Sequence, residues 1–221
     1  MTFSAGCATR PFVDCRPLRI PSPDGKSAIE VSYDTTPDYP DLEVARLRVT
    51  AVGKYVGEVE PVGSVESELT WSPDSKAFFI NGNDNANGDD HLAVHLLSDP
   101  ALGPRYITRD VVQDMARSFP PCEAKDPINI CAELAADPDG YIGVSALDWI
   151  HDSSEIVVMA EVPCSSSMGG IMCQVLGYEV QVPSGKILRR MEAKEFARRW
   201  QHSMAWKFED IGPPEFQTKL P

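Results

Sequence analysis

A turn followed by an apolar strand occurs twice in this chain. The first copy reads Leu-Thr-Trp-Ser-Pro-Asp-Ser-Lys-Ala-Phe-Phe-Ile over residues 69–80, and the second reads Leu-Asp-Trp-Ile-His-Asp-Ser-Ser-Glu-Ile-Val-Val over residues 147–158. A weaker third copy lies at residues 20–31 and lacks the tryptophan. Repetition of such a unit is typical of stacked β-modules, which bury their apolar faces against one another. Arrays of this kind usually bind partners rather than transform substrates.

Strand-like and turn-like segments divide the chain into three β-units between two proline-rich ends. Residues 1–27 carry four prolines and are predicted to form a tether, and residues 209–221 form a proline-rich tail. Residues 28–208 are predicted to form a single β-repeat domain. Its units lie at about 28–67, 68–120 and 145–208.

Two short helices are expected beside the strands. Thr108 or Asp110 caps the first, which runs through Arg117, and the second runs from about 193 to 205. Each carries an apolar stripe at helical spacing. The predicted fold class is mostly β: an incomplete, propeller-like array of antiparallel β-repeats with two short accessory helices.

The turn motif resembles the repeats of TolB-like and WD40-like β-propellers. The resemblance lies in Trp-Ser-Pro-Asp-Ser-Lys at residues 71–76 and in Ser-Pro-Asp-Gly-Lys at residues 22–26. It implies that each turn links two strands of a blade, that each tryptophan packs between blades, and that the protein is a scaffold for protein contacts, often in the bacterial envelope. It transfers no catalytic residue. Because a closed ring takes about four to eight blades, we expect an open array or a ring completed by a second copy in a homodimer.

The charge of the chain limits the kinds of partner it can have. Lysine and arginine number 20 against 33 acidic residues, so the formal net charge is −13. Such a surface repels phosphate backbones and anionic lipid, which argues against nucleic-acid binding and membrane docking. It attracts a basic protein partner, and the alternative is that the acidic surface serves only solubility. No apolar run approaches the roughly 20 residues of a membrane span.

Six cysteines fall into three local couples of similar spacing. The couples are Cys7 with Cys15, Cys122 with Cys131, and Cys164 with Cys173. Disulfides within such couples would close short loops, and they predict the periplasm or cell envelope as the compartment. The alternative is a cytoplasmic protein with free thiols.

The residues before Cys7 offer a second interpretation of that cysteine. Phe-Ser-Ala-Gly at residues 3–6 resembles the end of a bacterial lipoprotein signal, where small residues precede the lipidated cysteine. Lipidation of Cys7 would anchor the protein to a membrane surface. Cys15 would then remain free or pair elsewhere.

Two long hairpin loops are the predicted partner-binding sites. The first lies at residues 81–90 and the second between Cys164 and Cys173, where methionine and isoleucine offer an adaptable contact surface. Trp206 and Phe208 offer a second, aromatic contact surface. The alternative is that both belong to the core, and for Trp206 the core is the favoured interpretation. The predicted contact residues of the loops are Asn83, Asp84, Asn85, Asn87, Asp89, Asp90, Met168, Ile171 and Met172.

The first loop is also the best candidate for a metal. Its oxygen ligands would be Asn83, Asn85, Asn87, Asp89 and Asp90, at spacings similar to those of a calcium loop. The twelfth position holds a valine where a calcium loop has glutamate. A hairpin loop rich in turn-forming residues is the alternative, and no other cofactor is predicted.

No catalytic motif is present, so we expect a non-catalytic protein-binding module of the bacterial cell envelope. A sharper version is an immunity or inhibitor protein that neutralises a toxic effector. The alternative of another class is a metal-dependent hydrolase that uses His91, His95 and a nearby aspartate.

Overall fold

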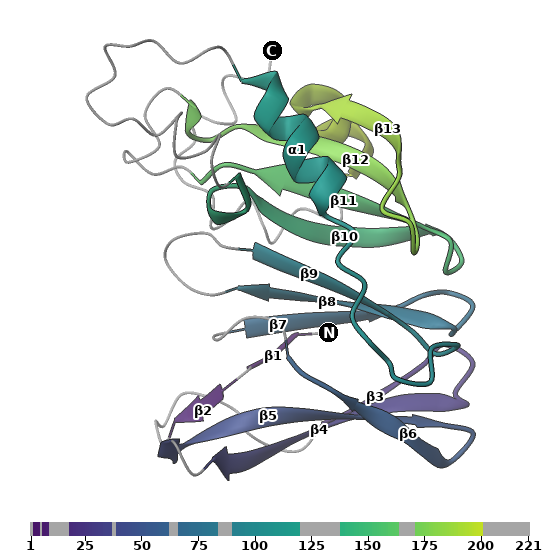
Figure 1. Ribbon diagram of the computed structural model, residues 1–221. Helices are drawn as coiled ribbons and strands as arrows, with labels where there is room; N and C mark the ends of the chain where they lie inside the picture. The colour runs from purple at the N-terminus through teal and green to yellow at the C-terminus, as the bar shows by residue number, and fades with distance from the viewer. Residues whose placement is uncertain are drawn as a thin grey trace.

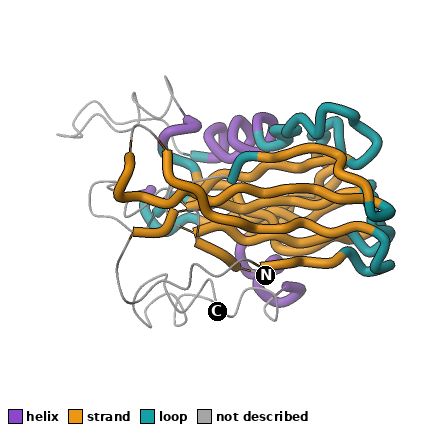
Figure 2. Tube along the Cα trace, turned by 90° about the horizontal axis from the view of Figure 1, so that it is seen from below, coloured by secondary structure: helices purple, strands orange, loops and turns teal. Residues whose placement is uncertain are grey.

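Three antiparallel sheets lie one on another in the computed structural model, which describes residues 2–4, 6–8, 18–36, 39–61, 66–83, 90–119, 138–163 and 171–200 (Figure 1). Each of the three predicted units contributes most of one sheet. The strands of all three sheets run alongside one another, and many of the described turns gather at one end (Figure 2). The prediction of a mostly β fold is confirmed.

The first sheet is built from the weak copy of the repeat and the strands after it. Its strands are β2 (Gly6–Ala8), β3 (Leu18–Pro21), β4 (Ser27–Thr36), β5 (Tyr39–Ala51) and β6 (Lys54–Val59). Apolar and charged residues alternate along β5, as in Leu47, Arg48 and Val49. Because successive side chains of a strand point to opposite faces, one face of this sheet is apolar and buried and the other is charged.

The second sheet lies in the middle of the stack. It contains β1 (Thr2–Ser4), β7 (Glu66–Trp71), β8 (Ala77–Asn83) and β9 (Asp90–Leu96), in that spatial order. β8 carries the apolar run Ala-Phe-Phe-Ile because both of its faces are covered. Phe78 and Ile80 pack toward the first sheet, and Ala77 and Phe79 pack toward the third. Beyond the outer edge of β9, Arg105 forms a single antiparallel bridge with Val94.

The third sheet is a four-stranded meander. Its strands are β10 (Gly143–His151), β11 (Glu155–Glu161), β12 (Val175–Gln181) and β13 (Ile187–Glu192), and a short 3-10 helix, η1 (Pro138–Gly140), precedes them. The register between β10 and β11 shifts after Ala146. Like β8, β11 is apolar on both faces, because the third sheet is covered on both sides.

Both predicted helices are present and pack against the third sheet. The first, α1 (Arg109–Ser118), covers the same face as the second sheet and is held by the Tyr178 hydroxyl, which donates to Asp114 at 3.1 Å. The second begins at residue 193 and is described through residue 200; its last predicted turn lies outside the described residues. It covers the opposite face, where Phe196 is fully buried.

The tether predicted for residues 1–27 is wrong where the structure describes it. The three-residue strand β1 pairs with β7 of the second sheet, and β2 pairs with β5 of the first. β3 is an integral strand beside β4. The start of the chain is therefore built into two sheets.

The repeated turns have the same hydrogen bonds in the first two units. Ser72 Oγ donates to Asp74 at 2.8 Å and accepts the Ala77 amide at 3.0 Å, and Ser22 makes the equivalent bonds to Asp24 and Ser27 at the same distances. These bonds explain why serine and aspartate recur two residues apart.

Tryptophan side chains connect consecutive sheets. Trp71 Nε1 donates to the Ile20 carbonyl at 3.3 Å, and Trp149 Nε1 donates to the Thr70 carbonyl at 3.3 Å. Ile20 and Thr70 occupy equivalent positions, each two residues before the serine of its turn. In the first unit, Pro21 stands where the second unit has Trp71.

Candidate functional site

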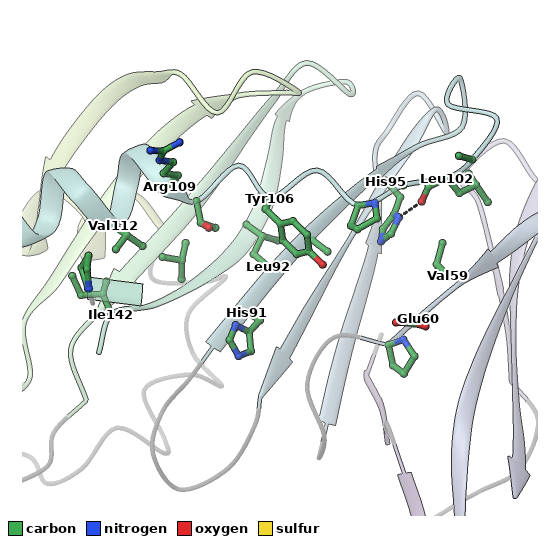
Figure 3. A pocket seen from close by; sticks show the side chains of 18 of the residues that line it. Val59, Glu60, His91, Leu92, His95, Leu102, Tyr106, Arg109, Val112 and Ile142 are labelled. Atoms are coloured by element: carbon green, nitrogen blue, oxygen red, sulfur yellow. Dashed lines mark hydrogen bonds between the residues drawn. The ribbon is translucent and has the colours of Figure 1, made fainter. Parts of the chain in front are cut away.

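A groove of about 960 Å³ follows the outer edge of β9 and is lined by residues from all three sheets (Figure 3). Glu58, Val59 and Glu60 come from the end of the first sheet. His91, Leu92 and His95 come from β9, and Ile142 and Val144 come from the start of the third sheet. The connection at residues 101–109 and the first turn of α1 complete the walls. The groove thus exists only because the three units are stacked.

The floor of the groove is apolar. Leu92, Val112, Ile142 and Val144 are all buried and belong to the core between the second and third sheets. These side chains are placed by their own strands and by α1, so the floor is rigidly supported. An apolar floor with a few polar groups around it is the usual chemistry of a binding site.

Polar and aromatic side chains surround this floor. Tyr106 is 69% exposed and lies between two ends of the groove, with Arg109 on one side and Glu60 on the other (Figure 3). Glu58 lines the same end of the groove as Glu60. Its carboxylate forms ion pairs with Arg48 at 3.4 Å and Arg46 at 3.7 Å. The groove therefore has one acidic and one basic end with an exposed aromatic ring between them.

His95 is a buried histidine beside the groove. Its ring stacks on Phe78 with centroids 4.9 Å apart, and its Nδ1 lies 2.7 Å from the Leu102 carbonyl oxygen. Because a carbonyl oxygen only accepts, Nδ1 carries the proton and Nε2 is an acceptor. Nε2 is buried and has no hydrogen-bond partner within the part of the chain that the structure describes. Burial lowers the pKa of His95, which keeps the ring neutral.

This burial has a consequence for stability. Because the pKa of His95 is lowered in the folded state, the unfolded chain binds more protons below the ordinary value of 6.5. We expect the free energy of unfolding to fall as the pH drops from 7 to 5, by at most about 1.4 kcal/mol per pH unit for one proton. Urea unfolding at several pH values measures this slope.

The His95→Asn variant provides the comparison for that slope, because the asparagine amide can donate to Leu102 but does not titrate. Its slope between pH 7 and 5 should be smaller than that of the natural chain. Equal slopes in the two proteins would contradict the assignment. Asp74 does not contribute in this range, because hydrogen bonds from Ser72 and Ser153 outweigh burial and hold its pKa below 3.8.

The two histidines predicted as metal ligands differ in their surroundings. Both line the groove, but His91 is exposed whereas His95 is buried with one nitrogen bonded to Leu102. Within the described ranges no three histidine, cysteine, aspartate or glutamate side chains are grouped as a metal site requires. The described residues thus give the hydrolase alternative no third ligand.

The predicted loop at residues 81–90 is shorter than expected. β8 and β9 pair as far as Asn83 and Asp90, whose side chains are not described, and residues 84–89 lie outside the described residues. Asp84, Asn85, Asn87 and Asp89 are among them, so the calcium site and the partner contacts in this loop stay predictions. Asn81 is not a loop residue, because it is buried in β8.

The second predicted contact surface is partly wrong. Ile171 is only 5% exposed and packs in the core between the second and third sheets, so it is not available to a partner. Met172 is 47% exposed, in agreement with a surface role. Met168, Trp206 and Phe208 lie outside the described residues.

One cysteine side chain can be described. Cys173 is disulfide-bonded. The pairing of Cys164 with Cys173 stays a prediction, as do the couples Cys7–Cys15 and Cys122–Cys131. The backbone of Cys7 lies in β2 opposite Glu43, and its lipidation stays a prediction.

Several residues of the groove gave no signal in the sequence. Tyr106, Glu60 and Arg109 belong to no motif or spacing pattern that indicates a binding site. Asn81 could have been noticed, because it is a polar residue that directly follows the apolar run of β8. It connects the second sheet to the third: its amide nitrogen donates to the Ala146 carbonyl, and its oxygen accepts the Ala146 amide, both at 2.8 Å.

Comparison of the chain with models of known protein families and with curated proteins finds no match. No helix of the described part is long and apolar enough to cross a membrane.

Proposed function

We propose that this chain is a non-catalytic protein-binding module and that its partner occupies the groove along β9. The observation that carries this proposal is the groove itself, which combines a buried apolar floor, an exposed tyrosine and charges of opposite sign at its ends. Aromatic side chains with apolar surroundings are enriched where proteins bind one another. With a net charge of −13, the chain favours a basic partner.

We further propose that the three sheets are blades of a propeller-like, open array. The four-stranded meander of the third sheet and the tryptophan bonds between consecutive sheets support this interpretation. Neither outer face of the stack is an exposed apolar surface in the part of the chain that the structure describes. The helix at residues 193–200 covers the outer face of the third sheet, and the outer face of the first sheet is charged.

We assign the protein to the periplasm or cell envelope of a bacterium. The disulfide at Cys173 supports this assignment, because disulfides persist in oxidising compartments and are rare in the cytoplasm.

Site-specific photocrosslinking in the native host tests the groove. A benzophenone amino acid replaces Tyr106 in one protein and Leu188 in a control, because Leu188 is 42% exposed on β13 and does not line the groove. We expect one discrete adduct from position 106 that position 188 does not form. Adducts at neither position, or the same adduct at both, would contradict the proposal.

A further inference from the structure

The exposed face of the first sheet carries a row of alternating charges. Arg19 of β3 lies opposite Glu30 of β4, Glu30 lies opposite Arg48 of β5, and Arg48 lies opposite Glu58 of β6. Residues directly opposite one another share a face, so the row runs positive, negative, positive, negative across four strands. With strands about 4.8 Å apart, its ends are about 14 Å apart.

The two neighbouring rows on this face carry few charges. On one side, Arg46 lies opposite Ser32, with 51% of the arginine side chain exposed. On the other side, Tyr55, which is 60% exposed, and Pro21 stand at the two ends of a row whose middle members are Thr50 and Ala28. The side chains described on this face include three arginines and two glutamates, whereas the whole chain has a net charge of −13.

We propose that this face binds a second copy of the chain across a two-fold axis parallel to the strands. Such an axis reverses the order of the strands, so Arg19 meets Glu58 of the second copy and Glu30 meets its Arg48. The same operation places Tyr55 over Pro21 of the second copy and Arg46 over its uncharged Ser32. The charge row is therefore self-complementary, as an isologous interface requires, and neither neighbouring row places like charges opposite one another.

A two-fold axis perpendicular to the strands lacks this complementarity. A two-fold axis along the charge row keeps the strand order, and each charge would then meet its own copy, which is repulsive. The face is also a favourable place for self-association, because elsewhere two acidic chains repel each other. An interface of exposed ion pairs on one small sheet is weak and sensitive to salt, so the dimer forms only at high protein concentration.

Charge variants of the row provide the test. In one variant Glu30→Arg and Glu58→Arg make the row wholly positive, and in the other Arg19→Glu and Arg48→Glu make it wholly negative. We expect sedimentation velocity to show a concentration-dependent dimer for the natural chain and monomers for each variant alone. The equimolar mixture of the two variants should form a heterodimer.

A fourfold variant is the matched control. Arg19→Glu, Glu30→Arg, Arg48→Glu and Glu58→Arg together reverse the row but keep its alternation, so this protein should dimerise with itself and not with the natural chain. Circular dichroism verifies that each variant is folded. A natural chain that stays monomeric, or a dimer that persists in both charge variants, would overturn the proposal.

Discussion

Replacing Gly177 with alanine should cost about 3 kcal/mol of the free energy of unfolding. A Cβ at this position of β12 would lie 1.9 Å from Cδ2 and 2.3 Å from Cγ of Phe196. Phe196 is fully buried on the outer face of the third sheet, so the ring has no room to move aside. The helix at residues 193–200 must therefore lift from the sheet, which exposes part of the apolar surface beneath it.

Urea unfolding of a double-mutant cycle measures this effect. Phe196→Ala alone should cost about 3–5 kcal/mol through the cavity it leaves. In the double variant the clash is gone, so its cost should be about 2 kcal/mol less than the sum of the two single costs. Gly57→Ala is the control, because its Cβ would approach Leu102 Cδ1 only to 3.1 Å and Cγ only to 3.8 Å, so a shift of a few tenths of an ångström relieves the contact. Additive costs for Gly177 and Phe196 would contradict the packing described here.

Replacing Asn81 with leucine should destabilise the protein by about 3 kcal/mol. Leucine fills the space but leaves the amide and carbonyl of Ala146 without their partners in a buried place. Unsatisfied buried polar groups cost about 1–3 kcal/mol each. Because Ala146 lies where the register of β10 shifts, these two bonds also hold the third sheet against the second. Urea unfolding gives the cost, and hydrogen exchange at the Ala146 amide should accelerate.

The Asn81→Asp variant separates hydrogen bonding from packing. A carboxylate still accepts the Ala146 amide but faces the Ala146 carbonyl and the Glu68 carboxylate, which accepts from Asn81 at 3.0 Å in the natural chain. The pKa of the new carboxyl is then raised in the folded state, so this variant should gain stability, relative to the natural chain, as the pH falls toward 5. Unchanged stability in the leucine variant would show that the bonds carry little energy.

Local pattern was sufficient to predict most of the strands. The apolar run of β8 reflects a strand that is covered on both faces, and the alternation in β5 reflects a strand that is covered on one face. Both patterns are visible in consecutive residues. The helix from Arg109 to Ser118 followed from its apolar stripe in the same way. Such features depend on side chains within a few positions of one another.

Features that depend on distant residues were not predictable in this way. β1 has only three residues, and it is a strand because Glu66–Trp71 lies beside it. The groove depends on the meeting of Glu60, Tyr106 and Ile142 from separate units, and no local signal marks any of them. Ile171 is a further example. Its loop-like neighbours in the sequence suggested an exposed residue, but packing against distant residues buries it.

The indole-to-carbonyl bonds give the stack a direction. Trp71 donates to Ile20, and Trp149 donates to Thr70, so each acceptor precedes its donor along the chain. During synthesis on a ribosome, the carbonyl that receives each unit is therefore already made when the tryptophan of the next unit emerges. Pro21 stands at the equivalent position of the first unit and has no indole, so the first sheet makes no bond of this kind through that position.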